Sequence, residues 1–295
     1  MHRPSLLLCL IIASLVAPSS LPVNVIARSN TPQSLPNTIF IPLITRTITH
    51  PPHSPNWLDR VNAYRARAGV PPVTESSALN SNCWEHARYM AENNHLTHNQ
   101  DPTKPFASPT GQICAQNGNA WIAWGNSWQP ADAVDSWMKS IGHRIWLLYP
   151  TTPTFGFGFY TTATAKCKLN NYNLLCNGAA LDVLSHFNPG ADADYPGWPV
   201  RYPGIDQTDV PATTYPITLQ WRYFGSTPSL TSTTLRVVGG NAIPHTSTTS
   251  LPVGHKGIAI TPTVNLPANS LIEVSVSGVY DGQPFTYTWQ FRTGN

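Results

Sequence analysis

The sequence predicts an α+β fold followed by a smaller all-β domain. Apolar residues recur at helical spacing in three segments between residues 57 and 141. Aromatic residues and glycines alternate from Phe155 to Tyr160, as they do in a β-strand. Beyond residue 215, further alternating segments lead to Asp281-Gly282, a favoured two-residue hairpin turn. These patterns place helices and strands together in the first part of the chain and strands alone in the second.

The composition is that of a folded protein with few charges. The chain has 295 residues, of which 41% are hydrophobic, so it can bury a large core. Charged residues make up 11% and the formal net charge is +3, whereas a typical soluble domain has roughly a quarter of its residues charged. A coiled coil, a charged disordered tail and a nucleic-acid binder that depends on basic residues are therefore excluded.

The N-terminus predicts a secretory signal. Met1-His2-Arg3 forms a short positive start, and an apolar run follows from Leu6 to Ala17. We expect cleavage after Ala27, which makes residues 1–27 a signal peptide, with cleavage after Ala17 as the alternative. The apolar run is shorter than the roughly 20 residues of a membrane-spanning helix, and no second segment is long enough. We therefore expect a secreted, extracellular protein with no transmembrane segment in the mature chain.

Four cysteines follow the predicted signal: Cys83, Cys114, Cys167 and Cys176. An even number in an exported chain predicts two disulfides, and four cysteines allow three connectivities. We favour Cys167–Cys176 with Cys83–Cys114. If Asn170 to Asn173 form a four-residue turn, Leu169 pairs with Leu174 and Cys167 lies directly opposite Cys176. A metal site is the alternative, but the chain has no Cys-x-x-Cys pair.

Three helices are predicted in the first part. One begins near Trp57 and stops at Gly69, a second spans about 76–93, and a third begins at Pro130 and ends at Gly142. The second helix carries one apolar face: Leu79, Cys83, His86, Ala87 and Met90. Because His86 lies within this face, we interpret it as a hydrogen-bonded core histidine. Trp121, Trp124 and Trp128 are expected in the loop before the third helix, either in the core or on a binding surface.

Proline-rich stretches divide the chain into parts. The predicted organisation is a signal peptide over 1–27, a linker over 28–55, an α+β domain over 56–188, a second linker over 189–214 and a β-sandwich over 215–295.

The hairpin around Asp281-Gly282 fixes a register for two strands. It pairs Gly278 with Phe285, and then Val276 with Tyr287, Val274 with Trp289 and Ile272 with Phe291. These residues share one face, while the other face is mainly polar. With further strands near 216–224, 232–239 and 256–264, the pattern predicts a small immunoglobulin-like sandwich.

Six sequence motifs follow one another in the α+β part. They are Val61 to Pro72, Leu79 to Met90 with His86-Ala87, His98, Gly111-Gln112-Ile113, Ser136 to Arg144, and the aromatic-glycine strand. In this order they resemble the CAP superfamily, or SCP domain, of cysteine-rich secretory proteins, antigen 5 and pathogenesis-related proteins. The resemblance covers about residues 56–187. It implies a three-layer α-β-α sandwich with a central cleft.

In that family the cleft holds two histidines and two acidic residues that can bind a divalent metal. The resemblance places the histidines at His98 and His143 and the acidic positions at Gln112 and Ser140. An amide and a hydroxyl supply neither the charge of two carboxylates nor a general base near neutral pH. We therefore interpret His98 and His143 as the polar floor of a binding cleft, with a weakly bound Zn²⁺ on these two histidines as the alternative.

These features together predict an exported binding protein rather than an enzyme. The expected partner is a small apolar ligand, a glycan or a cell-surface protein, and no nucleic acid. A metal-assisted extracellular hydrolase using His98 and His143 is one alternative, since proteolytic activity has been proposed within the family. A structural or adhesion protein of the cell surface is another.

Overall fold

The computed structural model describes residues 56–164, 167–169 and 172–295. The expected signal peptide over 1–27 and the linker over 28–55 lie outside the described residues. The described residues belong to one compact unit. Among the helices in the described part of the chain, none is both long enough and apolar enough to cross a bilayer.

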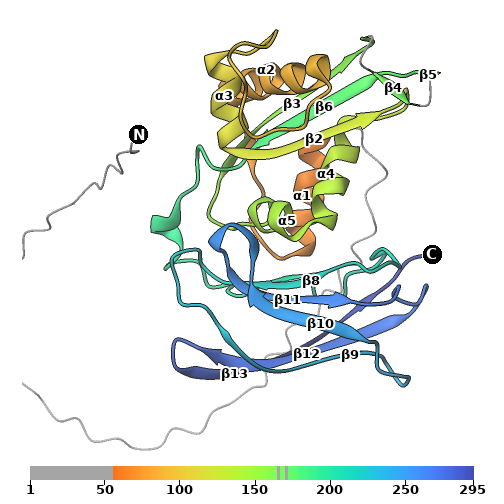
Figure 1. Cartoon of the computed structure of the whole chain (residues 1–295). Coiled ribbons are helices and arrows are strands. Elements are labelled where there is room, and N and C mark those ends of the chain that lie inside the picture. Colours follow the sequence, from red (N-terminus) through yellow and green to blue (C-terminus); the bar gives the residue numbers. More distant parts are fainter. Residues whose placement is uncertain (1–55, 165–166, 170–171) are drawn as a thin grey trace, which may run out of the picture. The chain divides into compact units, whose positions relative to one another are not determined.

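The first half of this unit is a four-stranded sheet with helices on both faces (Figure 1). Its helices are α1 (Trp57–Arg67), α2 (Ser77–Asn93), α3 (Pro109–Gln116), α4 (Pro130–Lys139) and α5 (Ile141–Leu147). Its strands are β1 (Thr74–Glu75), β2 (Gly118–Trp124), β3 (Thr154–Thr162) and β6 (Cys176–Asp182), with a small hairpin of β4 (Lys168–Leu169) and β5 (Tyr172–Asn173). The strand order is β1-β3-β6-β2. Helices α2 and α3 cover one face, and α1, α4 and α5 cover the other, which confirms the α+β prediction.

Helix α2 lies unusually close to the sheet because glycines face it. A Cβ atom added at Gly158 would lie 2.1 Å from the backbone nitrogen of Trp84, and one at Gly178 would lie 2.3 Å from the carbonyl oxygen of Ala87. No other residue type fits such an approach of helix backbone to strand backbone.

The phenylalanines of β3 face the opposite core. The ring of Phe157 stacks on Trp57 at a centroid distance of 5.0 Å and meets Trp137 edge-on at 6.3 Å. The indole Nε1 of Trp137 donates to the carbonyl of Ala120 on β2 at 3.0 Å. The alternation that predicts a strand from Phe155 to Tyr160 thus also separates two different packing faces.

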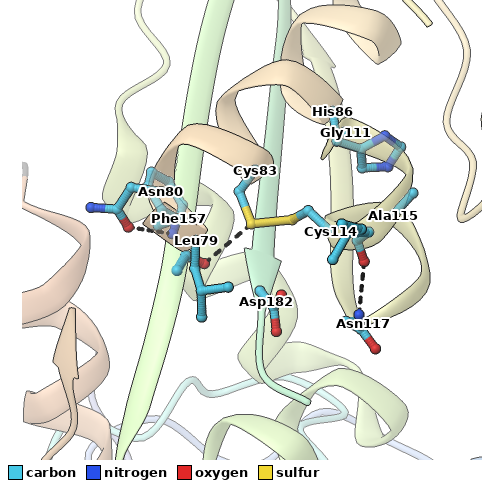
Figure 2. The surroundings of a disulfide bond; sticks show 12 residues. Leu79, Asn80, Cys83, His86, Gly111, Cys114, Ala115, Asn117, Phe157 and Asp182 are labelled. Atoms are coloured by element: carbon cyan, nitrogen blue, oxygen red, sulfur yellow. Dashed lines mark hydrogen bonds between the residues drawn. A yellow bond between two sulfur atoms is a disulfide. The ribbon is translucent and has the colours of Figure 1, made fainter. Parts of the chain in front are cut away.

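Both disulfides have the expected pairing. Cys83 on α2 is bonded to Cys114 on α3 (Figure 2), and Cys167 is bonded to Cys176 at the start of β6. The expected register of the second loop is wrong, because Leu169 pairs with Tyr172 rather than with Leu174. The backbone nitrogen of Leu174 donates to the carbonyl of Cys167 at 2.8 Å, so Cys167 faces Leu174 and reaches Cys176 diagonally.

The third helix ends earlier than expected. Helix α4 stops at Lys139, and Ser140 has extended backbone angles, φ −103° and ψ 127°. Helix α5 then begins at Ile141, so Gly142 lies inside a helix instead of ending one. Ser140 explains the break, since its nitrogen donates to the carbonyl of Trp137 while its carbonyl accepts from Arg144.

Strand β2 was not predicted from the sequence. Trp121 and Trp124 lie on this strand, which pairs antiparallel with β6, and only Trp128 lies in the segment before α4. Trp121 packs against Trp128 at 5.5 Å and against Phe159 at 6.4 Å. The prediction failed because β2 has no alternation of apolar and polar residues.

The second half is all-β. Its strands are β7 (Val200–Tyr202), β8 (Ile217–Gln220), β9 (Ser229–Val237), β10 (His245–Ser250), β11 (Lys256–Pro262), β12 (Leu271–Tyr280) and β13 (Gln283–Arg292). They form two antiparallel sheets with the orders β10-β11-β8-β7 and β13-β12-β9. Strand β7 belongs to the segment expected as a linker over 189–214. An immunoglobulin-like topology stays a prediction.

The hairpin register is confirmed at each predicted pair, including Gly278 with Phe285 and Ile272 with Phe291. Asp281 and Gly282 have φ values of 50° and 75°, as a tight hairpin turn requires. Ile272, Val274 and Val276 are fully buried, so the predicted apolar face is the core face.

One hydrophobic cluster runs from the α+β part into the β sheets. Arg144 of α5 is fully buried at this junction, and its guanidinium lies 4.5 Å from the centre of the Tyr215 ring and 5.0 Å from that of Tyr202. Its Nε donates to the carbonyl of Met138 at 2.7 Å, and another nitrogen donates to the carbonyl of Pro216. The arginine of the Ser136 to Arg144 motif is therefore a packing residue.

Replacing Gly158 with alanine tests the close packing of α2. The added methyl group must displace the helix backbone, so we expect Gly158→Ala to lower the free energy of unfolding by about 2 kcal/mol or more. At Gly190 the nearest atom to an added Cβ is 3.4 Å away, so Gly190→Ala should change stability by less than about 0.5 kcal/mol. Urea unfolding measures both, and equal midpoints for the two variants would contradict the packing argument.

Candidate functional site

A polar network around His86 holds the loop that follows α2. The side chain of His86 is 1% exposed. Its Nε2 lies 3.0 Å from the carbonyl oxygen of Thr97, and its Nδ1 lies 3.2 Å from Nε2 of Gln100. Because a carbonyl only accepts, the ring hydrogen is on Nε2, and Nδ1 accepts from the Gln100 amide. The interpretation of His86 as a hydrogen-bonded core histidine is confirmed.

Gln100 extends this network to α3. Its Oε1 accepts from the backbone nitrogen of Ser108 at 2.8 Å, and Ser108 caps α3 by accepting from the nitrogen of Gly111 at 3.0 Å. A Cβ at Gly111 would lie 2.4 Å from the Gln100 amide, so glycine makes room for it. Figure 2 shows His86 and Gly111 beside the Cys83–Cys114 bond. The disulfide and the network therefore fasten the same two helices.

His98 and His143 lie on separate elements. The Nδ1 atom of His98, in the loop after α2, lies 3.3 Å from the carbonyl of Ala115 and donates to it. His143 lies on α5 and is half-buried. Burial lowers the pKa of His143, and the charge on His98 lowers it further. The grouping of the two imidazoles in one cleft stays a prediction from the resemblance.

Gln112 lies on α3 and uses both ends of its amide. Its Oε1 accepts from the backbone nitrogen of Gln100 at 2.6 Å, and its Nε2 donates to Oδ1 of Asn99 at 2.6 Å. A carboxylate at this position could not donate to Asn99. The glutamine therefore fastens the loop that carries His98, and its amide is already engaged.

Ser140 lies between α4 and α5 and is half-buried. Its hydroxyl makes no capping bond to α5. Its backbone, rather than its side chain, has the clear structural role, because the break at Ser140 lets α5 turn away and positions His143.

The donors at this site do not fit a tightly bound divalent metal. In the described ranges, no group of three or more His, Cys, Asp and Glu side chains is arranged to hold a metal ion. Zinc usually takes three or four protein ligands. His98 and His143 offer two imidazoles, and the amide between the loop and α3 is engaged elsewhere.

A separate groove of about 530 Å³ lies between α2 and strand β3. Its lining includes Asn80, Ser81, Trp84, Glu85, Phe157 and Phe159. The indole of Trp84 is 39% exposed. This groove was not predicted from the sequence. Helical geometry places Trp84 off the apolar face of α2, and an exposed tryptophan is the feature that could have indicated a binding surface.

The loss of stability at acid pH tests the protonation state of His86. Burial lowers the pKa of His86 from 6.5 to about 4. Between these values the unfolded chain binds the proton and the folded chain does not, so stability falls as the pH drops from 6.5 to 4. For this one group the loss is about 3 kcal/mol. Urea unfolding at a series of pH values should therefore show that the free energy of unfolding falls less steeply between pH 6.5 and 4 for His86→Gln than for the parent protein.

The control is His186→Gln, the same change at an exposed histidine. It should reproduce the slope of the parent protein. An unchanged slope for His86→Gln would contradict a neutral His86 in the folded state.

Comparison with known proteins assigns part of the chain to a family. Residues 58–177 match the family model described as CAP, the cysteine-rich secretory protein family. Among solved structures, an outer surface protein from Borrelia burgdorferi is similar, with 18% identity over 42% of this chain and 87% of that chain and a TM-score of 0.29. No curated protein matches the sequence. Residues 58–177, which carry His86, His98, Gln112 and His143, are therefore a CAP domain.

Proposed function

We propose that the CAP domain is a non-enzymatic extracellular binding module for a small apolar ligand, a glycan or a cell-surface partner. The observation that carries the proposal is the double hydrogen bond of Gln112. By the resemblance, Gln112 takes the place of the family's first acidic residue, so a neutral amide engaged at both ends stands there and supplies no carboxylate base.

The extracellular location rests on disulfide chemistry. Two disulfides in a chain of this kind are typical of exported proteins and rare in the cytosol. The predicted signal over 1–27 and the family match to residues 58–177 support the same location. In this proposal the C-terminal sheets form an immunoglobulin-like sandwich that acts as a spacer or adhesion module.

A metal-assisted hydrolase is the second candidate. One observation favours it, namely that burial keeps His143 in the neutral form that can accept a proton or a metal. The missing carboxylates count against it, since two imidazoles without further donors hold zinc weakly.

Thermal unfolding with and without Zn²⁺ separates the two candidates. A metal at about 100 times its dissociation constant adds about 2.7 kcal/mol of stability. We expect no such shift in the parent protein. The Gln112→Glu variant restores a carboxylate beside the histidines, and we expect it to gain a Zn²⁺-dependent shift that disappears on adding His98→Ala.

His95→Ala is the matched control, because His95 is exposed in the same loop. It should not affect the shift gained by Gln112→Glu. Zn²⁺-dependent peptide hydrolysis by the parent protein, lost in His143→Ala, would overturn the binding-module proposal and establish the hydrolase.

A further inference from the structure

Strand β3 has an open edge. Its neighbour on one side is β6, which pairs with it from Gly156 to Thr162. On the other side β1 pairs with only two residues, Thr154 and Phe155. Among the described strands, none pairs with this side of β3 beyond Phe155.

The backbone groups on this edge point outward at every second residue. The carbonyl of Phe155 accepts from the nitrogen of Ser76, and the nitrogen of Phe157 donates to Oδ1 of Asn80 at 2.8 Å (Figure 2). Both contacts lie on the side away from β6. Since strand backbone groups alternate in direction, Phe159 and Thr161 direct their N–H and C=O groups to the same side.

This edge lacks the usual protection against pairing. Natural edge strands are blocked by charged side chains, prolines or bulges, but residues 157–162 read Phe-Gly-Phe-Tyr-Thr-Thr, with neither charge nor proline. Asn80 accepts from the outward N–H of Phe157, as a neighbouring strand would. It does not reach the outward backbone groups of Phe159 and Thr161. The side chain of Thr161 is exposed, so the end of the edge is accessible.

The groove beside the edge supplies a surface for side chains. Trp84 presents an exposed indole on one side of the groove, and Phe157, Gly158 and Phe159 of β3 line its other side. Glu85 is the charged residue in the lining of this groove. A second carboxylate, Glu92, accepts from the hydroxyl of Tyr160 on the same strand at 2.8 Å.

The nearby cation is held by aromatic rings. The guanidinium of Arg88 lies 4.1 Å from the centre of the Phe106 ring and 5.6 Å from that of Trp84. The edge is therefore bordered by the carboxylates of Glu85 and Glu92, while the charge of Arg88 is already packed between aromatic rings.

We propose that the open edge of β3, from Phe157 to Thr162, binds an extended peptide segment of a partner protein by strand addition. Main-chain hydrogen bonds to Phe159 and Thr161 give affinity, and the indole of Trp84 receives an apolar side chain at alternate positions. Glu85 and Glu92 favour a partner segment that is neutral or basic. This surface is distinct from the cleft of His98 and His143, so the inference does not depend on the function proposed for that cleft.

The test uses the mature chain and a labelled probe peptide. The probe alternates valine and threonine and carries a lysine at each end, and fluorescence anisotropy measures its binding. Thr161→Pro removes an outward N–H and keeps the main-chain bonds to β6. Thr161→Ala is the matched control, because it loses the same side-chain bond to Asn177 on β6 but keeps the N–H. We expect Thr161→Pro to weaken binding by about tenfold and Thr161→Ala to bind like the parent protein within about twofold.

Two further probes separate the contributions. A probe in which every backbone nitrogen is methylated cannot pair as a strand, and we expect it not to bind. Replacing the terminal lysines by glutamates should weaken binding to the parent protein, and Glu85→Gln should reduce that difference. Circular dichroism and thermal unfolding confirm that each variant is folded.

Three results would overturn the proposal. One is equal affinity of the Thr161→Pro and Thr161→Ala variants for the probe. Another is unchanged binding of the methylated probe. The third is a dimer of the parent protein that Thr161→Pro converts to a monomer in sedimentation, because a second copy of this chain would then occupy the edge.

Discussion

The contact of the α2 backbone with strands β3 and β6 is the constraint on which the CAP domain depends. It exists because Gly156, Gly158 and Gly178 face the helix and have no side chain that would hold it away from the sheet. At this distance Cys83 reaches Cys114, and His86 points into the loop that follows the helix. The order of the loop over 95–108 is thus a consequence of how closely one helix lies on its sheet.

The polar site follows from that arrangement. His86 and Gln100 form the inner part of a network, and Gln112 closes it from α3 with an amide bonded at both ends. His98 sits on the loop that this network holds, while His143 arrives from α5 through the break at Ser140. Neutral groups predominate here. In a buried site, neutral groups with complete hydrogen bonds are more easily accommodated than isolated charges. The Gln112 amide that holds the loop is neutral and already bonded at both ends.

The β part of the chain is joined to the CAP domain through the same core. Arg144 contacts the rings of Tyr202 and Tyr215, and Gln220 donates to the carbonyl of Ile145 at 2.9 Å. On the same helix, Trp146 lies 4.1 Å from the ring of His255, whose side chain is 3% exposed. Helix α5 therefore has two roles. It carries His143, and Arg144, Ile145 and Trp146 contact residues of the C-terminal part.

The sequence by itself determined those features that depend on neighbours along the chain. The periodicity of α2, the alternation in β3 and the hairpin register at Asp281-Gly282 all follow from local spacing, and the structure has them. The tertiary structure alone decided the features that depend on distant segments. Strand β2 has no alternation of apolar and polar residues, and its extended form is held by pairing with β6. The break at Ser140 goes with backbone hydrogen bonds to Trp137 on one side and Arg144 on the other. The engagement of Gln112 and the open edge of β3 require knowing which loop or strand lies opposite. Local propensity carries no such information, because those partners meet only after the chain has folded.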